Sequence, residues 1–384
     1  AYFIEESDGL IYMELVISNA RGFAKKNAVM LIAFAAALIT SLFVPVDKEY
    51  IGYFDFKTLS CLFCVLAVVC ALKDINFFFV IARKIVHFFK TARMSILALV
   101  YITFIGSMLI ANDMALLTFL PLGYFVFSTA GRKRDVALVF ILQNIAANLG
   151  GMLTPFGNPQ NLYLFSYYGL SVKTFLFVML PPFVLSAVLI LLCCLAFPKD
   201  RLSVPEAQVT VDSRQAAVYG GLFCLAVAMV LRLMPYVLGL TVIVLALWLL
   251  DRHALKTVDW GLLATFAAFF TFSGNLARME AVHILFARLL SHGTILISAL
   301  TCQIISNVPA AILLSRFTQD ACGLLVGVNV GGAGTLVASL ASLITFREYT
   351  RRVPNGGKRF LFLFSGISFA FLTILLAAMS VVMG

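Results

Sequence analysis

Long apolar runs alternate with short polar segments along the chain from residue 28 onward. About 20 apolar residues in a helix cross the hydrocarbon core of a bilayer, and slightly shorter runs cross with flanking help. Seven runs are predicted as membrane-spanning helices, at residues 28–45, 56–72, 174–197, 218–234, 237–250, 260–276 and 360–383. The pattern therefore predicts an all-α polytopic membrane protein.

Four further apolar stretches are interrupted by polar or helix-breaking residues. Residues 94–128 and 294–318 carry "AND" and "SNVPA" near their middles, and the second stretch is too short to cross a membrane twice. Both are therefore predicted as re-entrant hairpins. Residues 136–169 and 321–346 are interrupted by Gly and amide residues and are predicted as broken helices. Irregular backbone at membrane depth is tolerated only inside protein or beside a watered cavity, so these interruptions indicate a binding site.

Composition and charge agree with a membrane protein. The chain is 62% hydrophobic and 12% charged, which leaves no large polar block for a soluble domain. With the N-terminus in the cytoplasm and each hairpin returning to its own side, 21 of the 28 Lys and Arg residues fall on the cytoplasmic side and 7 outside. This bias follows the positive-inside rule, so the net charge of +10 needs no nucleic-acid partner. Residues 1–27 are predicted as a cytoplasmic amphipathic segment.

The chain also repeats itself. The segment "LKDINFFFVIARKIV" resembles "LARMEAVHILFARLL", and "SMLIANDMALLTFLPL" resembles "CQIISNVPAAILLSRF". In "NLGGMLTPFGNPQNLYLF" and "NVGGAGTLVASLASLITF" five residues align without a gap: Asn148 with Asn329, Gly150 with Gly331, Gly151 with Gly332, Thr154 with Thr335, and Phe165 with Phe346. The predicted organisation is 1–27 as the N-terminal segment, 28–55 as a first scaffold span and outer loop, 56–197 as repeat 1, 198–250 as linker and scaffold spans, and 251–384 as repeat 2.

The two hairpins enter from opposite sides in this topology, so the repeats are inverted. Inverted repeats with discontinuous helices at matching positions are typical of secondary transporters. Free N–H groups at the starts of half-helices attract anions, and freed carbonyls suit small cations. A single interruption could equally be an ordinary kink, with Asn as interhelical glue. Four interruptions in the same order in both halves favour a transport site.

At these motifs the chain resembles the ion transporter superfamily, which includes divalent-anion/sodium symporters, citrate permeases, arsenite permeases and a sodium/proton antiporter branch. The resemblance extends over nearly the whole chain from about Val29, and "VDWGLLATFAAFFTFSG" at 258–274 adds to it. It implies a scaffold and a moving transport domain in a homodimer, working by an elevator motion. The arms near 74–92 and 278–291 would join the two parts.

The resemblance also assigns site residues. In the dicarboxylate branch each tip has the sequence Ser-Asn-Thr, whereas the tips here are Ala111-Asn112-Asp113 and Ser306-Asn307-Val308. By this resemblance the substrate would be contacted by Asn112, Asp113, Asn158, Pro159, Asn307, Val308 and Ser339. The coupling sodium or proton would be held by Ala111, Asn112, Asp113, Gly157, Ser306, Asn307 and Ala338. Asp113 and Val308 replace the two Thr residues, which is a departure from plain dicarboxylate transport and closer to arsenite and other anion permeases.

Asp113 is the most informative residue of this set. A carboxylate at membrane depth is costly unless it is paired, protonated or bound to a cation, which favours a coupling role. The alternative is a cap that accepts backbone N–H bonds at the start of the second hairpin helix. The tips and breaks carry no Lys or Arg, so an anion would be held by amides, hydroxyls and helix N-termini together with bound cations.

The function expected from these observations is secondary transport of a small anion, carboxylate-like or inorganic, driven by a sodium or proton gradient. An arsenite-type efflux permease and a sodium/proton antiporter are the alternatives within transport, and an intramembrane enzyme is the alternative outside it. No HExxH, GxSxG or GxxxxGK motif is present, which argues against an enzyme and against ATP as the energy source. We expect no cofactor apart from sodium as coupling ion, a homodimer, and a multi-pass location in a bacterial or archaeal plasma membrane.

Overall fold

A computed structural model describes residues 27–129, 131–201 and 211–383 of the chain. These residues fold as helices joined by short loops, and their one bridge of β type pairs Thr91 with Arg201. The fold is all-α, as the apolar pattern predicts. The amphipathic segment expected at 1–27 lies outside the described residues, apart from its last position.

The predicted spans are present as helices. They are α2 (Ala28–Ser41), α4 (Phe56–Asp74), α10 (Val172–Leu195), α11 (Ser213–Val230), α12 (Tyr236–Leu250), α14 (Trp260–Ala277) and α20 (Gly357–Met383). Among the described residues, seven helical stretches are long and apolar enough to cross a membrane. Five of them are the predicted spans α4, α10, α11, α14 and α20, whereas α2 and α12 are shorter apolar helices. The helix α2 ends at Ser41 rather than at 45, because Pro45 disfavours helical backbone in the residue before it.

Short polar side chains begin many of these helices. A carboxylate or hydroxyl at the N-cap accepts one of the backbone N–H groups that have no partner within the helix. Asp55 caps α4, Ser171 caps α10, Asp259 caps α14 and Asp320 caps α18. These caps fix where the apolar runs start.

The interrupted stretches fold as broken elements, in agreement with their sequences. The first hairpin is α6 (Ala92–Leu109) and α7 (Asn112–Thr129), and the second is α16 (Thr294–Ile305) and α17 (Asn307–Leu314). The first broken helix is α8 (Val136–Gly150), the 3₁₀ turn η1 (Gly151–Leu153) and α9 (Pro159–Tyr167). The second is α18 (Ala321–Gly331) and α19 (Leu340–Arg352). The arms are α5 (Phe77–Phe88) and α15 (Glu280–Leu290), and two short helices complete the set, α3 (Glu49–Gly52) and α13 (Arg252–Thr257).

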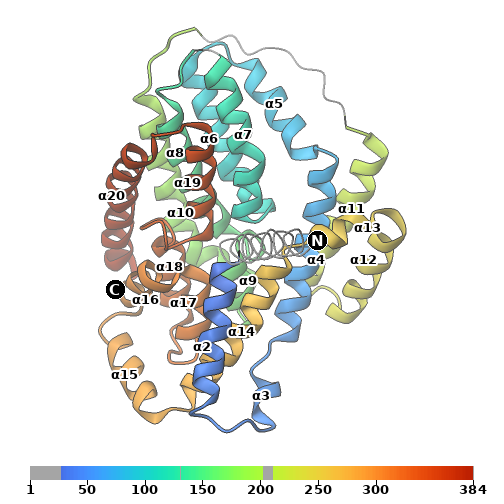
Figure 1. The fold of residues 1–384 in the computed structure, drawn as a ribbon, viewed down its shortest axis with the longest axis vertical. Helices are drawn as coiled ribbons and strands as arrows, with labels where there is room; N and C mark the ends of the chain where they lie inside the picture. Colours follow the sequence, from blue (N-terminus) through green and yellow to red (C-terminus); the bar gives the residue numbers. More distant parts are fainter. Residues whose placement is uncertain (1–26, 130, 202–210, 384) are drawn as a thin grey trace, which may run out of the picture.

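The two halves of the chain interlock. The helix α6 packs on α8 and α16 packs on α18, so each hairpin rests on the broken helix of its own half. The second helix of each hairpin reaches across, because α7 packs on α19 and α17 packs on α9. The arms α5 and α15 lie toward opposite ends of the molecule (Figure 1). The helix α14 packs mainly on α2, beside the hairpins.

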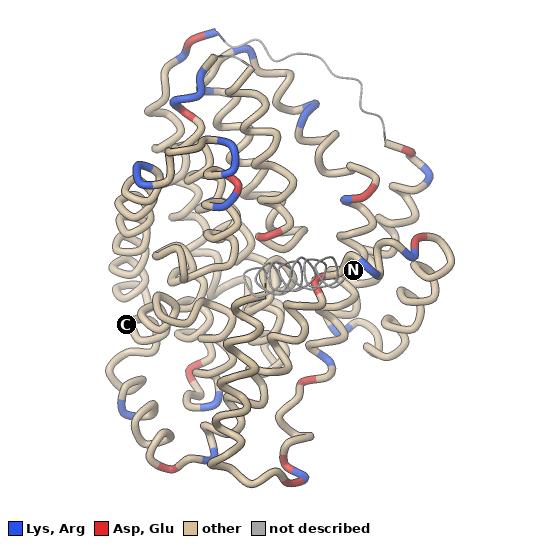
Figure 2. Tube along the Cα trace, in the orientation of Figure 1, with Lys and Arg blue, Asp and Glu red and all other residues tan. Residues whose placement is uncertain are grey.

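Charge is unevenly distributed along the long axis. Figure 2 shows Lys and Arg gathered at the end that holds the loops around α5 to α8 and the end of α19, with fewer at the opposite end near α3 and α15. An ion pair joins Arg278, after α14, to Asp47 with 2.6 Å between nitrogen and oxygen, at the sparsely charged end. This distribution is the one expected of a membrane protein under the positive-inside rule.

Matching positions in the two halves make matching contacts. The Thr154 hydroxyl donates to the Met108 carbonyl at 2.6 Å, and the Thr335 hydroxyl donates to the Gln303 carbonyl at 3.4 Å. The alignment of the two halves matches Thr154 with Thr335 and Met108 with Gln303. The inverted relation of the halves across a bilayer, and the division at 56–197 and 251–384, stay predictions.

Close backbone approach explains one aligned glycine in each half. A Cβ at Gly150 would meet the Phe104 carbonyl, and a Cβ at Gly331 would lie 2.8 Å from the Ala299 Cα. Real Cβ atoms essentially never approach so closely, and packed interiors have no room to relax. The two glycines therefore let each broken helix rest against the first helix of its hairpin.

Candidate functional site

Both hairpin tips and both breaks face one cavity of about 370 Å³. Residues from seven helices and their flanking loops line it. Its polar lining consists of Asn27, Asn112, Asp113, Gln160, Asp259, Thr265, Ser306, Asn307 and Ser339. Its apolar lining comes largely from α2, α14 and α16, including Met30, Leu262, Phe269, Phe272 and Ile305. A cavity of this size is suited to a small solute.

Four half-helices begin at this cavity. The first residues of α7, α9 and α17 line it, as does the first residue of α19: Asn112, Pro159, Asn307 and Leu340. A helix N-terminus carries unpaired N–H groups and a partial positive charge of about +0.5. The arrangement therefore presents positive dipole ends to the cavity from four directions, without a Lys or Arg among the described lining residues.

The first tip is fixed by amide hydrogen bonds and carries an unpartnered carboxylate oxygen. Asn112 donates from its Nδ2 to Asn148 Oδ1 at 3.1 Å, and its Oδ1 accepts the Asp113 N–H at 3.0 Å. Asp113 Oδ1 is buried and has no hydrogen-bond partner. Among the described residues, the carboxylate of Asp113 accepts no hydrogen bond from a backbone N–H, so its alternative role as a helix cap stays a prediction.

The second tip is joined to the loop that faces it. The Asn307 N–H donates to the Ala338 carbonyl at 2.9 Å, and the Ser306 hydroxyl donates to the same carbonyl at 3.3 Å. Asn307 Oδ1 accepts the Val308 N–H at 2.9 Å, which repeats the bond between Asn112 and Asp113 at the first tip. Ser306 has φ 76° and ψ 159°, a conformation that strains any residue except Gly.

A buried amide network joins the two broken helices. Asn329 in α18 donates from Nδ2 to Asn161 Oδ1 at 2.6 Å, and its Oδ1 accepts from Gln160 Nε2 at 3.3 Å. In the other direction, Asn144 in α8 donates from Nδ2 to the Ser342 hydroxyl at 3.2 Å. All five side chains are at most 1% exposed, so these bonds replace the water that the breaks would otherwise need. The network holds the two breaks at a fixed separation.

Each break is supported by a different side chain. In the first, Asn161 Nδ2 lies 3.2 Å from the carbonyl oxygens of Gly151, Met152 and Thr154. In the second, Gln303 from α16 donates to the Gly331 carbonyl and accepts the Thr335 N–H, both at 2.8 Å. These amides satisfy backbone groups that the interrupted helices leave unpaired.

Most of the predicted site residues share the cavity. Asn112, Asp113, Pro159, Asn307, Val308 and Ser339 line it, as does Ser306. Asn158 lies behind the lining and donates from Nδ2 to the Asn148 carbonyl at 3.3 Å. The Ala338 carbonyl, predicted as a cation ligand, already accepts two hydrogen bonds from the second tip. Ala111 and Gly157 flank the first tip and its break, and their roles stay predictions.

Sequence reasoning missed four polar residues of the cavity. Asn27, Gln160, Asp259 and Thr265 line it alongside the tips. Gln160 follows the predicted Pro159, and a cluster of amides in an apolar run could have suggested it. Asp259 and Thr265 lie in the segment 258–274 that resembles the superfamily. Asp259 also follows the polar segment 252–257 and precedes an apolar run, a position that predicts only a helix cap.

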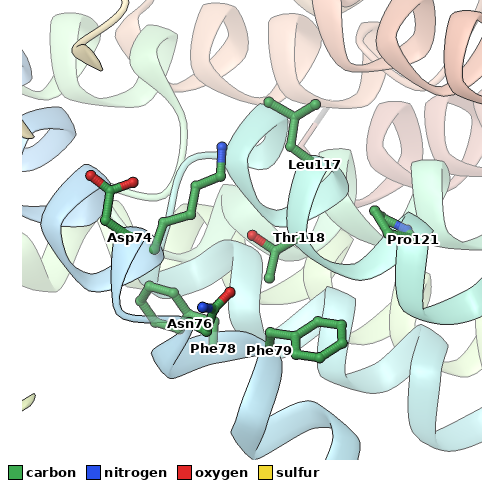
Figure 3. A pocket seen from close by; sticks show the side chains of 8 residues that line it. Asp74, Asn76, Phe78, Phe79, Leu117, Thr118 and Pro121 are labelled. Carbon is green, nitrogen blue, oxygen red and sulfur yellow. The ribbon is translucent and has the colours of Figure 1, made fainter. Parts of the chain in front are cut away.

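A second cavity, of about 380 Å³, lies away from the tips. Figure 3 shows its lining residues, which come from the end of α4, the start of α5 and the middle of α7 and include Asp74, Asn76, Leu117 and Pro121. It has neither a hairpin tip nor a break in its lining. It therefore marks the joint between an arm and a hairpin rather than the solute site.

Comparison with known proteins gives three matches. A family model described as citrate transporter matches residues 12–322. An uncharacterized transporter of Methanocaldococcus jannaschii is 30% identical over 342 residues, which cover 89% of this chain and 93% of that protein. The inner membrane protein YbiR of Escherichia coli is 31% identical over 320 residues, which cover 80% of this chain and 84% of that protein. The family model and both relatives thus describe membrane transport or a membrane location.

Proposed function

Because this multi-pass membrane protein belongs to the citrate transporter family, we propose that it is a secondary active transporter of a small anion, carboxylate-like or inorganic, coupled to a sodium or proton gradient. The observation that carries the proposal is the meeting of four helix N-termini at one cavity between the two hairpin tips. Transport through such a site is the activity that the family resemblance implies for this protein. We propose no enzymatic reaction.

The charges around the cavity explain why a cation would accompany the anion. Four helix N-termini together supply about two positive charges in partial form. Two carboxylates, Asp113 and Asp259, oppose them from the same lining. The partial charges of the helix N-termini and the two carboxylates then roughly cancel. An anion that entered alone would also be repelled by the carboxylates. A bound proton or sodium ion near Asp113 removes that repulsion, so anion and cation binding would be mutually favourable.

The alternation of access would follow from the moving parts that the superfamily resemblance implies. We propose that the hairpins and broken helices move together against α2, α4 and α14 in an elevator motion, within a homodimer. The amide network between the breaks supports this proposal, because it would keep the two tips at a constant separation while they move. The arms α5 and α15 would connect the moving part to the rest.

A transport measurement tests the proposal directly. Purified protein would be reconstituted in liposomes, and uptake of labelled citrate, other carboxylates and inorganic anions would be measured with an imposed sodium gradient, an imposed pH gradient or neither. The proposal expects at least one anion to accumulate against its gradient only when a cation gradient is present. Accumulation of sodium or protons in exchange for one another, with no anion moved, would overturn it.

That last outcome defines the second candidate, a sodium/proton antiporter. It is favoured by one observation, since the charged residues among the described cavity lining are two carboxylates. An arsenite permease gains no such support. Thiols near the site would suit arsenite, but Cys302 is fully buried and does not line the cavity, and its thiol lies 3.8 Å from the Val328 carbonyl.

A further inference from the structure

Asp259 is the second carboxylate of the cavity, and it lies on a different part of the molecule from the first. Its Oδ1 caps α14 by accepting the Leu262 N–H at 2.9 Å, which leaves its other oxygen outside that bond. Asp113 belongs to the first hairpin tip, whereas α14 packs on α2. The two carboxylates line the same cavity from different elements, Asp113 from the first hairpin and Asp259, an exposed residue, from the start of α14.

A residue of the same lining carries a buried oxygen without a partner. Gln160 lines the cavity and is 1% exposed, and its Oε1 has no hydrogen-bond partner, although its Nε2 is held by Asn329. Leaving a buried carbonyl oxygen unpaired costs about 1–3 kcal/mol, so such an oxygen indicates a missing ligand. Together with Asp113 Oδ1, the cavity offers two buried oxygens that lack a partner. Both are acceptors, which selects a cation or a proton rather than an anion.

Among the described residues, no Lys, Arg or His lines the cavity beside these acceptors. The helices packed on α7 and α14 do carry charged or titratable residues, but none of these lines the cavity: Lys57, Lys73, Asp74, Arg83, Lys84, His87, Arg93, Glu280, His283, Arg288, Arg347, Glu348, Arg351 and Arg352. Within the part of the chain that the structure describes, the two carboxylates line one cavity without a basic side chain in that lining, and such a pair favours binding of one positive charge.

We propose that Asp113 and Asp259 together bind one monovalent cation, Na⁺ or H⁺, with Gln160 Oε1 as a further acceptor for the ion. This inference deepens the proposed function, because it assigns the coupling ion to a site shared between the first hairpin and α14. Asp259 is a cation-binding residue as well as a helix cap. With the site empty, the two carboxylates repel each other, which disfavours the arrangement in which the hairpin faces α14. Cation occupancy would thereby select the position of the hairpin.

Thermal unfolding of the purified full chain tests the shared site. Unfolding would be followed while Na⁺ replaces choline at constant ionic strength, and in a separate series across pH, for the unchanged protein and for Asp113→Asn, Asp259→Asn and the double variant. Asn is as good an N-cap as Asp, so Asp259→Asn keeps α14 capped while removing the charge. Asp251→Asn is the matched control, because Asp251 caps α13 in the same way and does not line the cavity.

The expected result is a loss of cation response that is the same in three variants. In Asp113→Asn, Asp259→Asn and the double variant, the Na⁺ concentration for half-maximal stabilisation rises at least about tenfold, or the pH response is lost if H⁺ is the ion. The double variant is no worse than either single variant, because residues that act as one site are not additive. Asp251→Asn responds as the unchanged protein does.

Other results separate the failure of this inference from failure of the proposed function. If Asp259→Asn keeps the full cation response while Asp113→Asn loses it, Asp259 is a cap alone and the inference is overturned, but coupling at Asp113 stands. If the losses in the single variants add up in the double variant, the carboxylates bind different ions and the shared site is overturned. If the unchanged protein responds to neither Na⁺ nor pH, cation coupling itself fails. Should Asp259→Asn fold poorly, Asp259→Ser removes the charge with another strong cap.

Discussion

The two hairpin tips begin their second helices alike and differ in their chemistry. Each begins its second helix with an Asn whose Oδ1 accepts the next N–H, from Asp113 in the first tip and from Val308 in the second. The second tip is closed by two hydrogen bonds to the Ala338 carbonyl. Within the described residues, the first tip makes no equivalent bond to Gly157, and it offers a carboxylate oxygen without a partner.

This difference indicates different roles for the two hairpin tips. A tip whose donors and acceptors already pair within the protein is suited to fixed positioning of the solute. A tip with a free carboxylate pays a desolvation cost that only a cation or proton can remove, so it is suited to coupling. The two tips share a central Asn, and Asp113 and Val308 at the next position distinguish them.

The largest effect should come from the tip amides. Asn112→Ala and Asn307→Ala should each abolish measurable transport, because both side chains line the cavity and each accepts the next backbone N–H at the start of its helix. Asn112→Ala should also lower the free energy of unfolding by about 1–3 kcal/mol, since Asn148 Oδ1 loses its donor. Transport in liposomes and thermal unfolding check the two parts, with Gln215→Ala in the exposed first turn of α11 as control. Full transport in both variants would contradict the assignment of the site.

The second effect concerns only the first tip. Asp113→Asn should change the dependence of transport on sodium or pH more than the concentration of anion that gives half-maximal transport. The physical reason is that the substitution removes the negative charge but keeps the size and polarity of the side chain. Initial transport rates across sodium and pH series would measure it. An unchanged ion dependence would remove Asp113 from coupling and erase the proposed difference between the tips.

The third effect tests the supports of the breaks. Gln303→Met places at the second hairpin the residue that the first has at its matching position, Met108. It should destabilise the protein by about 1–3 kcal/mol, because the Thr335 N–H and the Gly331 carbonyl lose their partner. Met108→Gln is the reciprocal variant and should change stability less, since Asn161 already holds the first break. Equal effects from the two variants, measured by thermal unfolding, would show that the supports are not specific to each half.

The smallest effect comes from a carboxylate that does have a basic partner. The hydrogen bond from Arg278 holds the pKa of Asp47 below its ordinary value of 3.8. A carboxyl with a lowered pKa in the folded state stabilises the protein above its unfolded pKa, and this contribution is lost as the pH falls through the folded value. Asp47→Asn should therefore lower the Tm slightly at neutral pH, and the difference should vanish in acid and shrink with salt. A Tm difference independent of pH would contradict the ion-pair origin.

Much of the fold follows from the sequence, because in a membrane the apolar runs and their interruptions leave few alternatives. The spans, hairpins and breaks could be predicted, and so could the tip residues Asn112 and Asn307. The supporting network could not, since Asn144 with Ser342 and Asn329 with Asn161 join residues more than 160 positions apart. Asp259 was missed for another reason. A carboxylate before an apolar run predicts a helix cap, and only the packing of α14 brings that cap to the cavity.

The central claim is that the cavity between the tips binds an anion and a cation together. Its most direct measurement is the thermal stability of the purified protein with a panel of carboxylates and inorganic anions, each in sodium and in choline and across pH. A ligand at a hundred times its dissociation constant stabilises the folded state by about 2.7 kcal/mol. We expect at least one anion to raise the Tm only when sodium is present or the pH is low. Stabilisation by an anion that is equal in sodium and choline at every pH would contradict joint binding.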